Sequence, residues 1–352
     1  MPPSPSAAVW AGRHDGEGAA HARWHDVVQV LDELPDSAYD PRSAAQTVDH
    51  LALLGFCSDE GVRRNGGRPG AAEGPGALRA ALAPLAVHGR LACEEIGVLD
   101  RGDAVTEGEG LEAGQQQAAQ AVRAALDAEG CRLAVVLGGG HETAWASYCG
   151  LMESRVMTVR ADGSRPRWGV LNIDTHFDLR RESRPTSGTA FLQMAEAEAA
   201  QGAELEYAVL GIAEPSNTGA LFQEARRLGV RWMTDSECVE AGAVGIRRFV
   251  EDFAAELDVL YLTVDLDALP AAVAPGVSAP AALGVPVPEV SAAVRAAAGT
   301  GKLALLDVVE LNPALDVDSR TAKTAARLID EAVRTAFDAG APRNGHSAGD
   351  GA

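Results

Sequence analysis

The sequence is poor in basic residues, and this shortage already excludes one class of partner. Its 352 residues include 30 Lys and Arg against 50 Asp and Glu, which gives a formal net charge of −20. An overall negative field repels phosphate backbones and anionic lipid surfaces. We therefore expect no nucleic-acid partner and no membrane partner. A small anionic substrate remains compatible with this charge if basic side chains gather around it.

Cysteines and long apolar runs are also scarce. The five cysteines are widely spaced and form no Cys-x-x-Cys pair, which argues against both a zinc–thiolate site and a disulfide scaffold. Free thiols suit a reducing compartment. No uncharged apolar stretch reaches the roughly 18 residues of a membrane span, and the first residues lack the charged and apolar regions of a secretory signal. The sequence thus predicts a cytoplasmic protein.

The residues that are present have the composition of a folded globular protein, with 47% hydrophobic and 23% charged residues. Short apolar runs, mostly rich in Val, Leu and Ile, recur along the chain and are followed by Gly, Asp or Asn. Because their hydrophobicity is continuous rather than alternating, they predict strands that are buried on both faces. These runs are His50–Phe56, Arg132–Leu137, Trp168–Ile173, Tyr207–Ile212, Val230–Met233, Val259–Val264 and Leu303–Val309.

Segments with helical periodicity lie between these runs. The alternation of strand and helix predicts a three-layer α/β fold, with a mostly parallel central sheet and helices on both faces. We expect one domain over residues 23–338, a mobile N-terminal segment over residues 1–22 and a disordered tail over residues 339–352. The predicted helices are Glu112–Ala128, Ser187–Ala200, Thr218–Leu228, Ala241–Glu256, Pro288–Ala298 and Asp318–Phe337.

Side chains that bind metals follow three of the predicted strands. In an open parallel sheet, ligands bind beyond the carboxyl ends of the strands, so these positions are the first candidates for a site. One strand leads into three glycines and a histidine, a second into an Asp-x-His-x-Asp segment, and a third into Asp-x-Asp. Alternate positions of an extended segment point the same way. The six candidate ligands are His141, Asp174, His176, Asp178, Asp265 and Asp267.

Four carboxylates and two imidazoles suit two divalent cations better than one. A carboxylate-rich set with histidine and no thiolate favours Mn(II), and two such ions would prepare a hydroxide for hydrolysis. Other interpretations exist for each motif taken alone. A strand-end Asp is often a helix cap, three glycines often form a turn, and Asp-x-Asp also occurs in magnesium-dependent phosphoryl transfer. The occurrence of all three motifs at strand ends favours the metal centre.

In order and spacing, four blocks resemble the manganese-binding blocks of the ureohydrolase superfamily, which includes arginase, agmatinase and formimidoylglutamase. They are Gly138–Glu142, Asn172–Asp178, Thr263–Asp267 and Glu310–Pro313. The resemblance extends from about Trp10 to Phe337. Further blocks resemble formimidoylglutamases in particular: Trp10–Asp15, Gly55–Ala71, Phe177–Arg180, Ser187–Thr189 and Ala274–Pro280.

The resemblance implies a ligand set for each of two manganese ions. One ion would be held by His141, Asp174, Asp178 and Asp265, and the other by Asp174, His176, Asp265 and Asp267. Asp174 and Asp265 would bridge the two ions. The resemblance also implies the arginase-like fold and a homo-oligomer, either a trimer or a hexamer.

The resemblance further implies hydrolysis of N-formimidoyl-L-glutamate to L-glutamate and formamide in histidine degradation. Glu310 would hydrogen-bond the amidinium, and Asp178 would carry a proton to the departing amine. Arg180 is the first candidate to bind the substrate carboxylates, with Arg63, Arg64 and Arg68 as weaker ones. Asn65 and Ser187 are candidate polar contacts.

Two departures from the family pattern bear on the substrate. The loop that supplies a histidine in arginases corresponds to Arg181–Ala190 and has no histidine, which disfavours arginase itself. Thr175 stands where Ala is common, and we expect it on the side away from the ligands. The alternatives are a ureohydrolase acting on a guanidino compound, such as an agmatinase or a guanidino-acid hydrolase, and a non-catalytic metal-binding relative.

Overall fold

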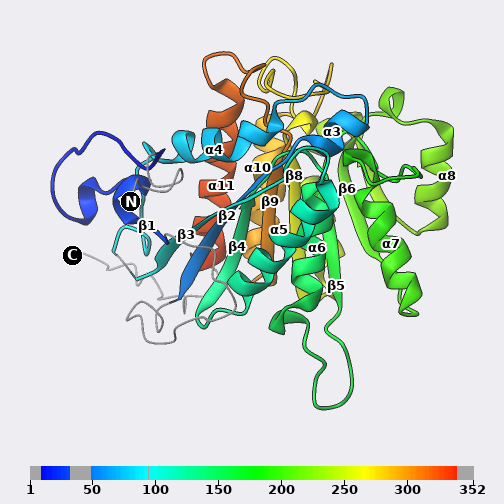
Figure 1. Ribbon diagram of the computed structural model, residues 1–352, viewed down its shortest axis with the longest axis horizontal. Helices are drawn as coiled ribbons and strands as arrows, with labels where there is room; N and C mark the ends of the chain where they lie inside the picture. The colour runs from blue at the N-terminus through cyan, green and yellow to red at the C-terminus, as the bar shows by residue number, and fades with distance from the viewer. Residues whose placement is uncertain (1–8, 32–48, 94, 339–352) are drawn as a thin grey trace, which may run out of the picture.

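A nine-stranded, all-parallel sheet forms the centre of the structure, a computed structural model that describes residues 9–31, 49–93 and 95–338 (Figure 1). The strand order is β1-β3-β2-β4-β9-β8-β5-β6-β7. The strands are β1 (Val28–Val30), β2 (His50–Cys57), β3 (Gly97–Val105), β4 (Cys131–Leu137), β5 (Trp168–Ile173), β6 (Glu206–Ile212), β7 (Arg231–Thr234), β8 (Val259–Asp265) and β9 (Leu303–Val309).

Helices cover both faces of this sheet, so the predicted three-layer α/β fold is confirmed. Four helices pack on one face: α4 (Gly74–Leu82), α9 (Asp235–Ala254), α10 (Val287–Gly299) and α11 (Arg320–Asp338). Four pack on the other: α5 (Leu111–Leu126), α6 (Thr143–Glu153), α7 (Ala190–Ala200) and α8 (Gly219–Arg227). The described residues also contain two short α-helices, α2 (Trp24–Val27) and α3 (Glu60–Arg64).

The strand interiors explain why the fold needs both layers. Successive residues of β2 enter opposite cores: Leu51 and Leu53 belong to the cluster under α4 and α11, whereas Ala52 and Leu54 belong to the cluster under α5 and α6. Side chains alternate across a strand, so a strand that is apolar at every position must be covered on both faces. The continuous runs in the sequence are therefore the cause of the layered architecture.

Some elements of the structure were not predicted from the sequence, most visibly β3. This strand carries Asp100 and Asp103 in its middle, so it has no continuous apolar run. Their charge is matched inside the protein, because Arg79 of α4 lies 2.8 Å from Asp100 and 2.6 Å from Asp103. The helices α3, α4 and α6 were also missed; α4 and α6 contain glycine, and α3 has only five residues.

The chain ends are described only in part. Trp10 donates an indole hydrogen bond of 2.6 Å to Asp100, so the described part of the N-terminal segment contacts the sheet. Residues 1–8 and the predicted tail over residues 339–352 lie outside the described residues, and the proposed domain boundaries stay a prediction. Within the described residues, no helix combines the length and the apolar character needed to cross a bilayer.

Candidate metal centre

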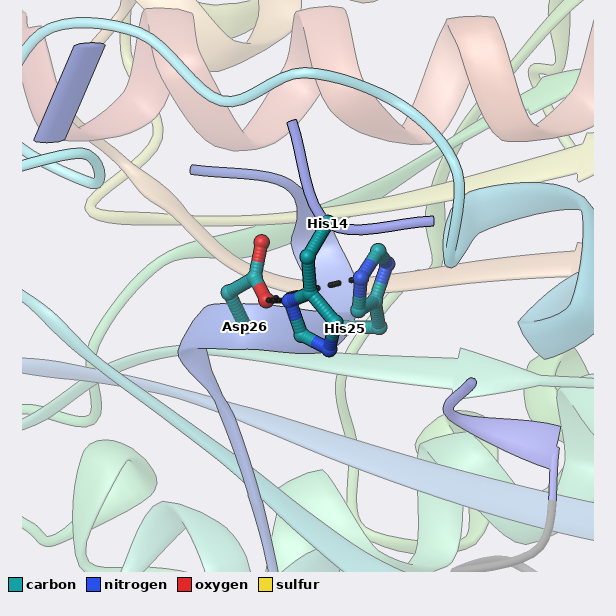
Figure 2. A group of neighbouring side chains, drawn as sticks. All are labelled: His14, His25 and Asp26. Atoms are coloured by element: carbon teal, nitrogen blue, oxygen red, sulfur yellow. Dashed lines mark ion pairs between the residues drawn. The ribbon is translucent and has the colours of Figure 1, made fainter. Parts of the chain in front are cut away.

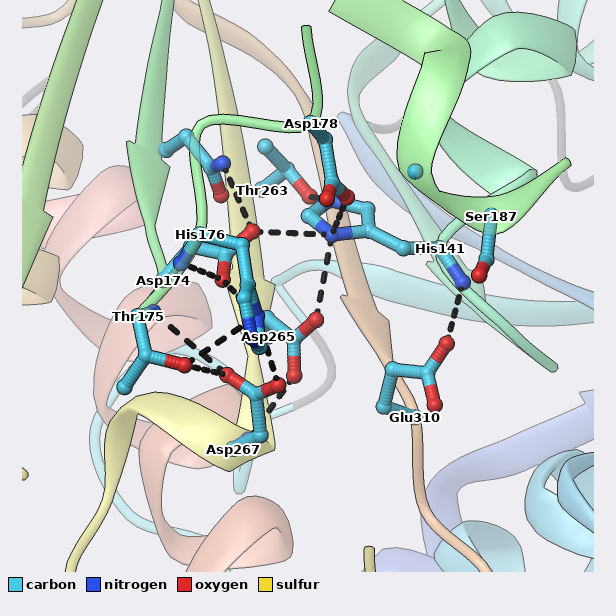
Figure 3. Close-up of polar contacts among 12 residues, drawn as sticks. His141, Asp174, Thr175, His176, Asp178, Ser187, Thr263, Asp265, Asp267 and Glu310 are labelled. Carbon is cyan, nitrogen blue, oxygen red and sulfur yellow. Dashed lines mark hydrogen bonds and ion pairs between the residues drawn. The ribbon is translucent and has the colours of Figure 1, made fainter. Parts of the chain in front are cut away.

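The candidate ligands converge at the carboxyl ends of four neighbouring strands. In the sheet, β4, β9, β8 and β5 lie side by side. Glu310 and Asp174 directly follow β9 and β5, Asp265 ends β8, and His141 lies in the loop after β4. Because parallel strands all end at the same edge, four segments far apart in the sequence meet at one place (Figure 3).

His141 lies at the centre of the first group of ligand atoms. Its Nδ1 is 3.1 Å from a carboxylate oxygen of each of Asp174, Asp178 and Asp265. The other ring nitrogen, Nε2, is 3.1 Å from the hydroxyl oxygen of Thr263 on β8. The ring is therefore turned so that Nδ1 faces the three carboxylates, as Figure 3 shows. An imidazole held by a hydrogen bond at one nitrogen is well placed to bind a metal through the other.

A second group shares Asp174 with the first. The Nδ1 of His176 lies 3.4 Å from one oxygen of Asp174 and 3.1 Å from an oxygen of Asp267. The backbone N–H of Asp267 donates a 2.8 Å hydrogen bond to Asp265, which joins the two groups on the side of β8. The ligand atoms of His141, Asp174 and Asp265 lie within 4.8 Å of one another, and so do those of Asp174, His176 and Asp267. Each of these sets is close enough to share an ion.

Burial and mutual repulsion govern the electrostatics of the cluster. Burial, and then the charges of Asp267 and Asp174, raise the pKa of Asp265 well above its usual range. Burial and Asp174 also raise the pKa of Asp178. For Asp174, burial acts to raise the pKa, but hydrogen bonds with His141 and His176 outweigh burial and lower the pKa. Adjacent buried carboxylates resist common ionisation without positive charge between them.

Glu310 lies beside this cluster but points into the open space next to it. One of its oxygens accepts a 2.8 Å hydrogen bond from the backbone N–H of His141, which fixes the carboxylate. Burial, and then the nearby charge of Glu142, raise the pKa of Glu310 to about 8. A cationic group of a substrate in this space would favour the ionised form of this carboxyl and would then have an anionic partner of fixed orientation.

The glycines before His141 let its loop pass close to the neighbouring segments. A Cβ on Gly139 would lie 1.8 Å from the backbone oxygen of Ser58, which follows β2. The loop is held there by a 2.9 Å hydrogen bond from Gly140 N–H to the same oxygen and by a 2.7 Å bond from Glu310 N–H to the carbonyl of Gly139. The three glycines thus position the histidine by close packing.

Two residues that hydrogen-bond candidate ligands were not predicted to do so. The side-chain amide of Asn172 donates a 3.0 Å hydrogen bond to Asp174. Our expectation for Thr175 was wrong: its hydroxyl donates a 2.8 Å hydrogen bond to Asp267, so it contacts the candidate ligands. Alternation along an extended segment suggested the opposite side, but the chain turns after β5 and brings Thr175 back towards β8. Asn172 lies two residues before Asp174 and Thr175 directly after it. This closeness in sequence to a candidate ligand was the signal that could have predicted their supporting role.

The cluster forms the floor of a cavity of about 380 Å³. Its walls include three of the predicted substrate-binding residues, Asn65, Arg180 and Ser187, together with Arg68. Asn65 donates a 3.2 Å hydrogen bond to the hydroxyl of Ser187. The guanidinium of Arg68 donates to the backbone carbonyls of Val277 and Ser278, so it is already engaged. Donors and a cation therefore face the candidate ligands across the cavity.

The structure does not place Arg63 in this wall. Its guanidinium lies 2.6 Å and 2.7 Å from the oxygens of Glu60, and the side chain is half exposed. Arg64 pairs with Glu60 and Glu112 and is also not part of the cavity wall. These arginines could not be told apart from the sequence, because the short helix α3 that turns them away from the cavity was not predicted.

Comparison with known proteins agrees with this architecture. The Arginase family model matches residues 49–334. The formimidoylglutamases of Rhodococcus jostii (strain RHA1) and Nocardia farcinica (strain IFM 10152) are each 48% identical to this chain over 329 residues. Each alignment covers 94% of this chain, and 94% and 96% of the two relatives respectively.

Solved structures share the fold. The formimidoylglutamase from Bacillus subtilis superimposes with a TM-score of 0.75 over 92% of this chain and 93% of that chain, at 23% identity. The Trypanosoma cruzi formiminoglutamase with Mn2+2 superimposes with a TM-score of 0.71 over 86% of this chain and 97% of that chain, at 26% identity. With a family match over most of its length and relatives nearly half identical to it, the chain belongs to the arginase family.

Proposed function

We propose that this protein hydrolyses N-formimidoyl-L-glutamate to L-glutamate and formamide, with two Mn(II) ions as its cofactor. The observation that carries the proposal is the cavity that brings five of the six candidate metal ligands together with Glu310 and Arg180. The sixth ligand, Asp174, is grouped with these ligands and is fully buried. The substrate combines an amidinium with two carboxylates. The cavity offers a carboxyl group, Glu310, for the first and a cation, Arg180, for the second. Relatives with 43–48% identity over most of the chain that bear the name formimidoylglutamase support the same activity.

The residues present fit two manganese ions. The Nδ1 of His141 is buried without a hydrogen-bond partner although it faces three carboxylates, which is the arrangement of a ligand atom rather than a donor. Carboxylate and imidazole without thiolate suit Mn(II). We propose the ligand sets implied by the resemblance, with Asp174 and Asp265 shared between the ions. When bound, the ions would lower the pKa of a water molecule and polarise the formimidoyl group.

The protein's own groups then bind the amidinium and move the proton. The fixed carboxylate of Glu310 accepts hydrogen bonds from the amidinium nitrogens and so orients the formimidoyl carbon towards the ligand cluster. Asp178 takes the proton released by the attacking water and delivers it to the amine nitrogen of the departing glutamate. Its carboxylate is suited to this role because it lies between the ligand cluster and the cavity.

The two substrate carboxylates face the opposite wall of the cavity. Arg180 supplies the positive charge there, and Asn65 and Ser187 supply neutral hydrogen-bond donors. Their positions are linked, since Asn65 donates to Ser187 and the backbone N–H of Arg180 donates 2.9 Å to the carbonyl of Gly188. A substrate with a cationic end and an anionic end would therefore bind in a single orientation, with its cationic end at Glu310 and its anionic end at Arg180.

A substrate panel tests the function. Manganese-loaded protein is incubated separately with N-formimidoylglutamate, arginine, agmatine and a guanidino acid, and formamide, ammonia and urea are measured individually. We expect formamide from N-formimidoylglutamate and no urea from the others. Urea without formamide would identify a guanidino substrate, and no product from any substrate would indicate a non-catalytic relative.

The Asp265→Ala variant tests the metal centre. Asp265 is 2% exposed and contacts both ligand groups, so its loss removes a ligand from each ion. We expect the variant to lose bound manganese, measured by elemental analysis after gel filtration, and to lose detectable turnover. Asp162→Ala, an exposed change outside the cavity, should behave like the unmodified protein. Full turnover by a folded, metal-free Asp265→Ala protein would exclude the binuclear mechanism.

We also propose a homo-oligomer, a trimer or a hexamer, in the cytoplasm. Helix α9 supports an assembly, because it exposes the apolar side chains of Val239 and Val244 to 52% and 76%. Light scattering coupled to gel filtration measures the mass and distinguishes the two assemblies from a monomer. A monomeric mass at micromolar concentration would contradict the proposal.

A further inference from the structure

Three metal-binding side chains gather in the N-terminal segment, outside the cavity and at the β1 edge of the sheet. They are His14, His25 and Asp26, and their ligand atoms lie within 4.8 Å of one another (Figure 2). His25 and Asp26 belong to the short helix α2, which leads into the edge strand β1, whereas His14 comes from the preceding loop. Figure 1 shows this segment at the end of the sheet away from β6 and β7.

The buried ring of His25 has one nitrogen prepared to bind a cation. Its Nδ1 lies 2.7 Å from the carbonyl oxygen of Ala83, and because a carbonyl only accepts, Nδ1 carries the hydrogen. In the neutral ring, Nε2 therefore presents a lone pair. The side chain is 3% exposed and Nε2 has no hydrogen-bond partner. Such a buried acceptor is costly unless a positive group satisfies it.

The lone pair of His25 faces an anionic oxygen. The distance from Nε2 to Oδ1 of Asp26 is 3.4 Å. The other oxygen of Asp26, Oδ2, accepts a 2.9 Å hydrogen bond from the backbone N–H of Arg23, which fixes the carboxylate with Oδ1 towards the histidines. The guanidinium of Arg23 is engaged by Asp15 and by the carbonyl of Pro84. The two ligands of α2 are thus oriented by contacts outside the group.

His14 completes the group from the solvent side. Its Nδ1 lies 2.9 Å from Oδ1 of Asp26, and its side chain is 74% exposed. The two rings meet edge to face with their centroids 5.2 Å apart. Bonds of about 2.0–2.1 Å at tetrahedral angles place ligand atoms about 3.3–3.4 Å apart. His25 and Asp26 already have this spacing, at 3.4 Å, and the exposed ring of His14 is free to adjust to it.

We propose that His14, His25 and Asp26 bind a divalent metal ion, preferably zinc, and that a water molecule is the fourth ligand. For a ligand set of two imidazoles and one carboxylate, affinity rises along the divalent first-row metals from manganese towards copper and zinc. Zinc should therefore bind here more tightly than manganese. The site is separate from the six residues of the candidate metal centre. Its proposal does not depend on the reaction proposed above.

A bound ion would join the N-terminal loop to the domain. The loop already packs against His25, since a Cβ on Gly12 would lie 2.6 Å from the ring. Trp10 of the same loop reaches Asp100 of β3. The ion would add a link between these contacts and α2, and so stabilise the position of the segment beside β1. Its effect is therefore on stability, because no residue of the group lines the cavity.

Zinc binding to the full-length, manganese-loaded protein tests the site. ZnCl₂ is titrated into the protein during equilibrium dialysis against excess manganese, and bound zinc is measured by elemental analysis. The test variant is His14→Ala, because this exposed ring leaves the core intact, and the matched control is His21→Ala, another exposed histidine of the same segment. Asp26→Asn provides a second variant that removes the charge and keeps the shape.

We expect the unmodified protein and His21→Ala to bind one more zinc per chain than His14→Ala, or to bind it at least roughly tenfold more tightly. Zinc should raise the melting temperature of the first two proteins and not of His14→Ala or Asp26→Asn, while all four retain turnover. A zinc anomalous signal between the three side chains would support the site directly. Identical zinc isotherms for all four proteins would overturn it and leave a proton as the partner of His25.

Discussion

At the scale of single residues, two of the four non-glycine residues with positive φ in the described part of the chain lie at the proposed site. Asp178 and Glu310 have φ of 47° and 69°, whereas the other two, Asp318 and Ser319, directly precede α11. This conformation costs of order 1–3 kcal/mol and persists only where the surroundings impose it. At Glu310 these surroundings are identifiable, because its N–H donates to Gly139 and its carboxylate accepts from His141. The two residues proposed to orient the amidinium and move the proton are thus held in place.

Substitution of Arg180 tests the assignment of the substrate carboxylates. A hydrogen bond between charged groups contributes about 1.5–3 kcal/mol, so Arg180→Ala should lower kcat/KM for N-formimidoylglutamate by roughly 10–100-fold. The loss should appear mainly in KM, because the proposed contact of Arg180 is with the carboxylates and not with the reacting carbon. Steady-state kinetics with release of formamide measures both parameters.

A truncated substrate sharpens this test. N-Formimidoyl-4-aminobutyrate lacks one carboxylate, and if Arg180 binds that group, the effects of truncation and of Arg180→Ala should not add. Arg181→Ala is the matched control, because Arg181 pairs with Glu196 and is 68% exposed. Full additivity would show that Arg180 does not bind the carboxylate that the truncated substrate lacks. Equal losses in Arg180→Ala and Arg181→Ala would remove Arg180 from the binding site.

At the scale of elements, the sequence predicted strands well where hydrophobicity is continuous. Trp168–Ile173 and Leu303–Val309 agree with the structure at both ends. The prediction from the sequence failed at β3, because the buried charges of this strand are neutralised by Arg79 from another element. It also failed at α6, because glycine and polar residues interrupt the helical periodicity of the apolar residues. The candidate ligands were predictable because they directly follow apolar runs. The cavity wall was predictable only in part: Asn65, Arg180 and Ser187 line it, whereas Arg63 does not, because α3 turns that side chain away.

The loop between β4 and α6 yields a prediction about packing. Gly139→Ala would place a methyl group 1.8 Å from the backbone oxygen of Ser58, and a backbone atom cannot move aside cheaply. We expect a loss of about 1–3 kcal/mol in the free energy of unfolding. We also expect roughly 10–100-fold weaker manganese binding, because the loop carries His141. Urea unfolding and metal titration measure the two effects.

Gly76→Ala is the control for this prediction. A Cβ at Gly76 meets no atom within 4 Å and the residue lies in helix α4, so alanine there should be neutral or stabilising by about 0.5–1 kcal/mol. Manganese affinity should be unchanged. Equal behaviour of the two variants would show that the close approach of the loop to Ser58 does not position the histidine.

At the scale of the whole molecule, overall charge and local charge have opposite consequences. The net charge of −20 describes the surface and disfavours polyanionic partners. In the cavity, four aspartates would be offset by two divalent cations, and Arg68 and Arg180 line the wall. The proposed dianionic substrate is therefore compatible with an acidic protein. The same contrast between surface and interior determines the chemistry of the cysteines.

Four of the five thiols are protected by the fold. Burial raises the pKa of Cys131 to about 11 and the pKa of Cys57, Cys149 and Cys238 to about 12. Cys93, in contrast, is exposed. Since the thiolate is the reactive form, a thiol reagent at pH 8 should modify Cys93 alone in the native protein and all five cysteines after unfolding. Mass spectrometry of the labelled protein identifies the sites, and Cys93→Ser should abolish native labelling.

The same shifts predict an alkaline limit to stability. Each buried thiol has a folded pKa above its ordinary value of about 9, so the folded state favours the protonated form. The stabilisation is complete below about pH 9, where both states are protonated, and is lost as the pH rises towards 11–12. The free energy of unfolding should therefore fall with pH above 9, and Cys131→Ala should reduce that slope. Equal slopes in this variant and in the unmodified protein would show that ionisation of Cys131 is not coupled to unfolding.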